Sequence, residues 1–400
     1  MNKFLAATAA VALTAGGAFA GGHTEIKLGV LLGFTGPAES LAGNMAAGAE
    51  TAIAEVNESG LLLGGASVTP IRADSTCIDA AAATAAAERL ITSDGVSGIV
   101  GALCSGATGA ALTNVAVPNG TVMISPSATS PGLSHASNED EGLFFRTAPS
   151  DARQGVVMTE ILMEEGIMEV AVTYTNNDYG KGLADSFEAA FTAAGGTVTI
   201  NIPHEDDKAD YSAEVANLAS AGGDRLVVAG YLDQGGPGII RAALDTGAFD
   251  SFHLPDGMIG QATEDNFGSE IDGSTGQVPG TDSPGAAIMA ELPSAVEGAD
   301  ITAPFAPESY DAAALIMLAM QAAGSSDPAD YKDHVMSVAN APGEEILPGE
   351  LAKGLQILAD GGEIDYVGGS AVELIGPGES AGNYRQIEVI DGVLETVQFR

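Results

Sequence analysis

The stretch IKLGVLLGFTGP at residues 26–37 joins a run of apolar residues to a glycine-rich turn. The run Ile26–Leu32 is typical of a buried strand, and the Ala-rich segment 42–56 that follows it is typical of a helix. A further apolar run at Val68–Ala73 predicts the next strand. Because strand, helix and strand alternate in this order, the stretch predicts the start of a parallel sheet with helices on both faces.

The same alternation continues along the chain in two successive series. In the first series, Asp79 is expected to cap a helix over 80–91. The pattern pauses at the acidic segment 138–142 and then resumes, with Asp151 expected to cap a helix over 152–165. Further strands are expected at 96–100, 122–125, 170–175, 198–202, 225–229 and 251–254, and further helices at 106–117, 180–194, 209–220 and 236–246. The sequence therefore predicts an α/β protein with two doubly wound units.

The last part of the chain, beyond Gly273, is less regular. Helices are expected at 308–323 and 328–339, and two short strands at 384–390 and 393–399. An Asp-Gly dipeptide, which is common in turns, separates these two strands. We therefore expect the tail to complete a sheet and not to form a third domain.

The charge balance excludes two classes of partner. The chain has 400 residues, of which 54 are acidic and 14 basic, and its formal net charge is −40. Nucleic acids and anionic membranes both attract basic surfaces, so neither is expected as a partner. The hydrophobic fraction of 46% also excludes a disordered acidic chain.

The first twenty residues are predicted to be a targeting segment. Lys3 gives a short positive start, residues 4–14 form an apolar run too short to cross a bilayer, and Ala18-Phe19-Ala20 is a small-x-small cleavage site. We therefore expect a signal peptide over 1–20, cleavage after Ala20 and export of the mature chain.

Cys77 and Cys104 are the only two cysteines in the chain, and the expected export bears on their oxidation state. In an oxidising compartment a disulfide between them is expected. Two buried thiols or one reactive cysteine are the alternatives. A zinc site is not expected, because no histidines cluster with the pair.

Polar loops follow three of the predicted strands of the first unit, at 33–37, 103–108 and 125–131. Ligands of open α/β sheets bind beyond the carboxyl ends of the strands, where free backbone N–H groups and hydroxyls suit a carboxylate or phosphate. The alternative is that each Ser or Thr only caps the next helix.

In the second unit, Tyr179, Tyr231 and Asp256 occupy comparable positions. Tyr231 and Asp256 follow predicted strands, and Asp256 lies in a Pro-Asp-Gly turn. Turn formation alone would also explain Asp at this position.

Enzyme motifs are missing from the sequence. It contains no GxSxG, HExxH or GxxxxGK[ST] motif, and no GxGxxG after a strand. The five histidines are scattered without metal-ligand spacing. We therefore expect neither an enzyme nor a metal or cofactor site.

Six motifs, in this order, resemble the leucine/isoleucine/valine-binding proteins, the periplasmic receptors of ABC transporters for hydrophobic amino acids. The resemblance covers about residues 25–399. The motifs are IKLGVLLGFTGP at 26–37, GALCSGAT at 101–108, MISPSATSP at 123–131, FRTAP at 145–149, YGKGLA at 179–184 and YDAA at 310–313.

The resemblance implies a type I periplasmic-binding-protein fold. Two doubly wound α/β lobes would be joined by three crossovers, near Thr147, Gly276 and Tyr366, with the ligand in the cleft between them. Lobe 1 would then comprise residues 25–146 plus 277–365, and lobe 2 residues 147–276 plus 366–400.

The resemblance also implies ligand contacts in the first lobe. Ser105, Ser127 and Thr129 match residues that hold the α-carboxylate and α-amine of an amino acid, with Ala128 between the last two and position 127 acting largely through its backbone. Leu41 stands where the family often has an aromatic wall.

In the second lobe, Tyr179 and Tyr231 match residues that close over the ligand. Asp256 matches an acidic residue, Glu in the best-known members, that pairs with the α-ammonium. The shorter Asp of this chain changes the reach to that ammonium.

Taken together, the resemblance implies a monomeric periplasmic solute receptor of an ABC importer. It would bind a branched-chain or related amino acid, close around it and deliver it to the permease subunits, without a cofactor. The alternative is a soluble sensory protein that binds a small amide or carboxylate.

Overall fold

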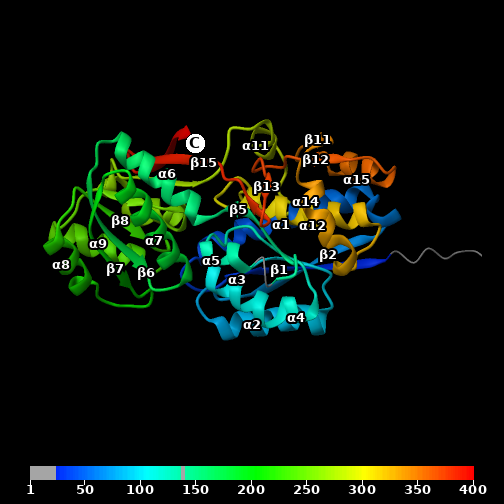
Figure 1. Cartoon of the computed structure of the whole chain (residues 1–400), viewed down its shortest axis with the longest axis horizontal. Helices are drawn as coiled ribbons and strands as arrows, with labels where there is room; N and C mark the ends of the chain where they lie inside the picture. The colour runs from blue at the N-terminus through cyan, green and yellow to red at the C-terminus, as the bar shows by residue number, and fades with distance from the viewer. Residues whose placement is uncertain (1–23, 137–139) are drawn as a thin grey trace, which may run out of the picture.

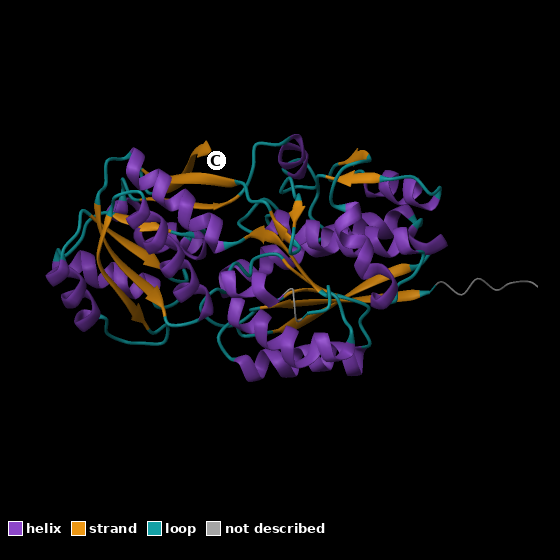
Figure 2. Cartoon of the chain, in the orientation of Figure 1, coloured by secondary structure: helices purple, strands orange, loops and turns teal. Residues whose placement is uncertain are grey.

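The computed structural model describes residues 24–136 and 140–400, so the predicted signal peptide lies outside the described residues. The described chain forms two seven-stranded sheets, each flanked by helices (Figures 1 and 2). This arrangement confirms the predicted fold class of two α/β lobes. Among the described residues, no helix combines the length and apolar character needed to cross a bilayer.

The first sheet has the strand order β13-β14-β5-β4-β3-β1-β2. Strands β1 to β5 pair in parallel, and the antiparallel pair β13–β14 extends the edge at β5. Its strands are β1 Glu25–Leu32, β2 Ser67–Asp74, β3 Ile99–Gly101, β4 Met123–Ser125, β5 Phe144–Pro149, β13 Leu374–Ile375 and β14 Glu379–Ser380.

The second sheet has the order β16-β15-β10-β9-β8-β6-β7. Five of its strands are parallel, while β15 and β16 add in antiparallel fashion as the sheet completion expected from the sequence. Its strands are β6 Glu169–Thr175, β7 Thr197–His204, β8 Arg225–Ala229, β9 Phe252–Leu254, β10 Thr275–Pro279, β15 Tyr384–Ile390 and β16 Val393–Phe399. A separate small sheet pairs β11 Glu344–Ile346 with β12 Ile364–Tyr366.

Helices cover both sheets (Figure 2). Those of the first lobe are α1 Glu39–Ser59, α2 Ala80–Glu88, α3 Ser105–Ala111, α4 Val117–Asn119, α5 Pro131–Ala136, α11 Pro284–Met289, α12 Ala306–Ala323, α13 Pro328–Tyr331, α14 Val335–Val338 and α15 Leu351–Ala359. Those of the second are α6 Asp151–Glu164, α7 Asp178–Ala193, α8 Ser212–Ala221, α9 Gly236–Thr246 and α10 Gln261–Phe267.

Helix α12 forms the centre of the first lobe. It is apolar on all sides and almost wholly buried, as expected for a helix enclosed by other elements. It packs closely on α1, where a Cβ at Gly48 would lie 2.1 Å from the carbonyl oxygen of Ala306. The close approach therefore depends on glycine at position 48.

The sheets place the third passage between the lobes later than expected. Strand β14 still belongs to the first sheet and β15 to the second, so the chain passes between Ser380 and Tyr384 and not near Tyr366. The first two passages follow Pro149 and Pro279. The two-residue strands β13 and β14 have too few residues to show a periodic pattern in the sequence.

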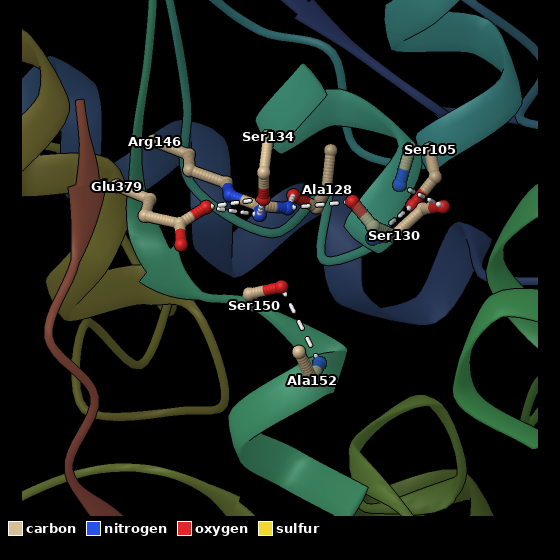
Figure 3. Close-up of polar contacts among 9 residues, drawn as sticks. Ser105, Ala128, Ser130, Ser134, Arg146, Ser150, Ala152 and Glu379 are labelled. Atoms are coloured by element: carbon tan, nitrogen blue, oxygen red, sulfur yellow. Dashed lines mark hydrogen bonds and ion pairs between the residues drawn. The ribbon is translucent and has the colours of Figure 1, made fainter. Parts of the chain in front are cut away.

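One predicted helix cap is also wrong. Ser150, and not Asp151, caps α6: its hydroxyl accepts a hydrogen bond of 3.3 Å from the Ala152 N–H (Figure 3). Asp151 is the first helical residue and is fully buried. The predicted cap Asp79 is confirmed, since its carboxylate accepts from two N–H groups of α2.

Candidate ligand-binding site

A small cavity lies between the lobes, beyond the carboxyl ends of parallel strands of both sheets. Its free volume is about 20 Å³, which is room for one water molecule. It is lined in the first lobe by Ala38, Leu41, Leu103, Cys104, Ser105, Ser127 and Phe305, and in the second by Tyr179, Tyr231, Asp256 and Gly257. The structure therefore brings six of the eight predicted ligand-binding residues to one cavity; Ala128 and Thr129 do not line it.

Hydrogen bonds between the segments that follow β3 and β4 position the first-lobe hydroxyls. The Ser105 hydroxyl accepts from the Ser130 N–H at 3.1 Å and keeps its own proton for another acceptor (Figure 3). The Ser127 hydroxyl donates to the Leu103 carbonyl at 2.8 Å and keeps its lone pairs. One hydroxyl can therefore still donate and the other can still accept.

Arg146 supports the loop at 125–131 through hydrogen bonds to its backbone. The sequence analysis did not identify this residue. Its buried guanidinium, on β5, donates to the carbonyls of Ala128 at 3.0 Å and Ser130 at 2.9 Å (Figure 3). It also pairs with Glu379 of β14 at 2.5 Å. Ala128 thus contributes a carbonyl to Arg146, behind the cavity. The FRTAP motif that contains this arginine was the available signal.

Thr129 also lies behind the cavity. Its carbonyl accepts from the Asp151 N–H at 2.8 Å, and its buried hydroxyl has no hydrogen-bond partner among the described residues. Thr129 thus joins the loop to the start of α6.

Two tyrosines and an aspartate form the second-lobe wall. The rings of Tyr179 and Tyr231 stack with centroids 5.1 Å apart. The Tyr179 hydroxyl donates to Asp256 Oδ1 at 2.6 Å, and the Gly257 N–H donates to the same oxygen at 2.8 Å.

Asp256 is 1% exposed, and no Lys or Arg of the described chain forms an ion pair with it. Burial raises the pKa of its carboxyl to about 6, although the hydrogen bond from Tyr179 opposes this shift. The cavity wall therefore holds a buried acid without a cationic partner.

A second buried acid, Asp151, lies near Asp256. Its Oδ1 accepts from Gln154 at 2.8 Å, and its Oδ2 has no hydrogen-bond partner among the described residues. Burial, and then repulsion by Asp256, raises the pKa of Asp151 well above its ordinary value. Both shifts favour the neutral form of the Asp151 carboxyl group, which lies behind the cavity wall.

The remaining wall is apolar. Leu41 and Phe305 are both nearly buried, and the predicted disulfide between Cys77 and Cys104 is present, with Cys104 in the wall. Phe305 was missed, because it precedes α12 in a segment without a periodic pattern. Within residues 24–136 and 140–400, no cluster of side chains suits a metal ion.

Known proteins resemble this chain over most of its length. Residues 25–343 match the model of a family described as periplasmic binding protein. The chain is 34% identical over 238 residues to Leu/Ile/Val-binding protein homolog 3 of Brucella melitensis, an alignment that covers 59% of this chain and 62% of the relative, less than two thirds of its length. It is 27% identical over 388 residues to a chemotactic signal transduction system substrate-binding protein of Halobacterium salinarum, covering 93% of this chain and 88% of that protein.

A solved structure gives the same result for the fold. The leucine binding protein of Thermotoga maritima superposes with a TM-score of 0.79 at 21% identity, covering 94% of this chain and 98% of the other. The family match includes strands β1 to β10 of the two sheets and all residues that line the cavity between them. The chain therefore belongs to the periplasmic binding protein family that includes the leucine/isoleucine/valine-binding proteins.

Proposed function

We propose that this protein is an exported solute receptor of an ABC importer, which binds an α-amino acid between its lobes and delivers it to a membrane permease. The observation that carries the proposal is the buried Asp256 carboxylate, which lacks a cation among the described residues and faces a cavity with serine hydroxyls on its other side. A buried carboxylate without a cationic partner is unfavourable. A ligand that supplies the cation removes this cost and therefore gains affinity.

A zwitterion fits the distribution of polar groups. The Ser105 proton suits the α-carboxylate, while Asp256 and the lone pairs of Ser127 suit the α-ammonium. Because these groups belong to different lobes, only a closed arrangement satisfies both charged ends of the ligand.

The apolar residues of the cavity wall favour a ligand with an aliphatic side chain. Leu41, Leu103 and Phe305 contribute apolar surface to the cavity. A hydrophobic amino acid would therefore bury its side chain against them.

The small size of the cavity indicates that the two lobes must open to admit a ligand and close around it. Because the free volume of about 20 Å³ is far smaller than an amino acid, entry requires the lobes to separate. The ligand then favours the closed form by its differential affinity for that form. The closed form is what we propose the permease recognises.

A thermal-shift series tests the ligand class directly. L-leucine should raise the melting temperature more than 4-methylpentanoate, which lacks the ammonium, and more than leucinamide, which lacks the carboxylate. If 4-methylpentanoate stabilises the protein as much as leucine, the site is a carboxylate site and the amino-acid proposal is wrong.

A sensory role is the second candidate. The resemblance to a chemotactic substrate-binding protein over 93% of this chain favours it. Deleting the gene separates the two roles. Loss of radiolabelled leucine uptake supports the importer, whereas normal uptake with lost chemotaxis towards leucine supports the sensor.

The remaining parts of the proposal concern the state of the protein. We propose a monomer in the periplasm, without catalytic activity and without a cofactor. The relatives of the chain, which are named as binding proteins, support the absence of catalysis. Size-exclusion chromatography with light scattering tests the monomer.

A further inference from the structure

A second, larger cavity lies on the other side of Phe305. Its volume is about 210 Å³, and it is lined by the end of β10, α11, the start of α12 and strands β15 and β16. Figure 1 shows α11 and β15 along the same edge of the molecule, where the two lobes meet. Phe305 lines both cavities and forms the partition between them.

Two titratable side chains face this cavity. Glu308 is 2% exposed, and its Oε2 has no hydrogen-bond partner among the described residues. Arg385 is half-buried on β15, and within 24–136 and 140–400 its guanidinium forms neither a hydrogen bond nor an ion pair. The Glu308 and Asp300 carboxyl groups lie near enough to Arg385 to act on its pKa, but within 24–136 and 140–400 neither of them forms an ion pair with it.

Glu308 is set up to act as a donor. Burial, and then the nearby Asp311 carboxylate, raises the pKa of Glu308 to about 8, while Arg385 opposes the shift. Its carboxyl group is therefore largely protonated at neutral pH and has an O–H to donate. Asp311 itself is saturated, since it accepts hydrogen bonds from Tyr366, Gly369 and Ser370.

The cavity thus offers one fixed positive charge, one hydroxyl donor and apolar walls. A guanidinium binds a carboxylate through paired N–H groups, and the protonated Glu308 supplies a further hydrogen bond to the same group. Met289 and Phe399, with Phe305, provide an apolar surface for the rest of the molecule. The volume is below that of pockets for drug-sized ligands, so the occupant is small.

We propose that this cavity is a second binding site, for a small organic carboxylate, in which Arg385 pairs with the carboxylate and Glu308 donates to it. The site does not depend on the proposed function of the main cavity. Because its walls come from both lobes, its occupancy is linked to the arrangement of the lobes.

The experiment uses sodium benzoate as the probe and the mature protein labelled with ¹³C in the methionine methyl groups. The Met289 methyl resonance should shift on titration with benzoate, owing to the aromatic ring beside it. Neutral benzamide should give no saturable shift, because it cannot pair with Arg385.

Two variants locate the binding. Arg385→Gln should weaken benzoate binding about tenfold to a hundredfold, as expected for a lost charge-assisted bond, and Ser105→Ala in the main cavity should not change it. Glu308→Gln, whose amide can still donate, should keep binding within about threefold, while Glu308→Leu should weaken it. Circular dichroism and melting temperatures check that each variant folds.

Three results would overturn the proposal. The first is that the Met289 methyl resonance does not shift when benzoate is added at millimolar concentration, in 20-fold excess over the protein. The second is an equal shift with benzamide. The third is binding that is lost in Ser105→Ala and kept in Arg385→Gln, which would place benzoate in the main cavity.

Discussion

Tyr179 lies in the first turn of α7, which follows β6, and Asp256 begins a short 3-10 helix that follows β9; the Tyr179 hydroxyl donates to Asp256 Oδ1 at 2.6 Å. This bond fixes the carboxylate at the wall of the cavity. It also offsets part of the free energy that burial of the carboxylate costs. The hydrogen bond therefore favours the ionised form of the Asp256 carboxyl group, although the side chain is almost fully buried.

Replacing Asp256 should abolish most of the affinity for an amino acid. Asp256→Ala should lose about 2–5 kcal/mol of binding free energy for L-leucine, because the ammonium would be buried without a partner. Isothermal titration calorimetry measures the loss. Asp151→Asn is the matched control, since Asp151 is also buried but does not line the cavity. A loss below tenfold in Asp256→Ala would contradict the role of the carboxylate.

The stability of the ligand-free protein should depend on pH through Asp256. Its pKa in the folded state is raised from an ordinary 3.8 to about 6. The folded state therefore binds the proton more tightly, so this contribution to stability is complete below about pH 4 and is lost as the pH rises through 6. Relative to Asp256→Asn, the wild type should lose roughly 2–3 kcal/mol of unfolding free energy between pH 4 and pH 8. Urea unfolding of both proteins at several pH values measures this difference, and parallel curves would refute it.

Removing the disulfide should destabilise the first lobe. Cys77 and Cys104 are 27 residues apart in sequence, and the chain-entropy model gives about 3.5 kcal/mol for a loop of that length. The double variant with Ser at both positions should show this loss in guanidinium unfolding. Two free thiols in mass spectrometry of the unreduced wild type would contradict the bond.

Two glycines of α1 should respond to alanine in opposite ways. Gly48→Ala would bring a Cβ to 2.1 Å from the Ala306 carbonyl oxygen, so α1 and α12 must separate and roughly 1–3 kcal/mol of stability should be lost. Gly43 has open space around it, and Gly43→Ala should gain up to about 1 kcal/mol from helix propensity. Melting temperatures of the two variants check both signs, and a gain in Gly48→Ala would show that the helices do not pack as described.

The local sequence pattern was sufficient to predict helices, strands and caps wherever that pattern was strong. The turn at Asp391-Gly392 and the strands on both sides of it were predicted to the residue, as was α9. Asp79 was a correct cap, because an Asx side chain followed by an Ala-rich run leaves few alternatives. The alternation of strands and helices was enough to predict two α/β units.

The errors arose where tertiary contacts decide. Nothing in the local sequence around Glu379 shows that it pairs with Arg146 more than two hundred positions earlier, so the last passage between the lobes was predicted too early. Asp151 and Ser150 are both good caps by residue type, and only the buried environment of Asp151 separates them. Phe305 reaches the cavity from an irregular segment, which no periodic pattern can reveal.

The packing of α12 on α1 has a consequence for synthesis. The buried face of α1, near the start of the chain, has no complete cover until residues 306–323 have emerged from the ribosome. An N-terminal fragment that ends at Pro149 would also lack β14, which pairs with β5. The first lobe can therefore complete its core only after most of the chain has been made.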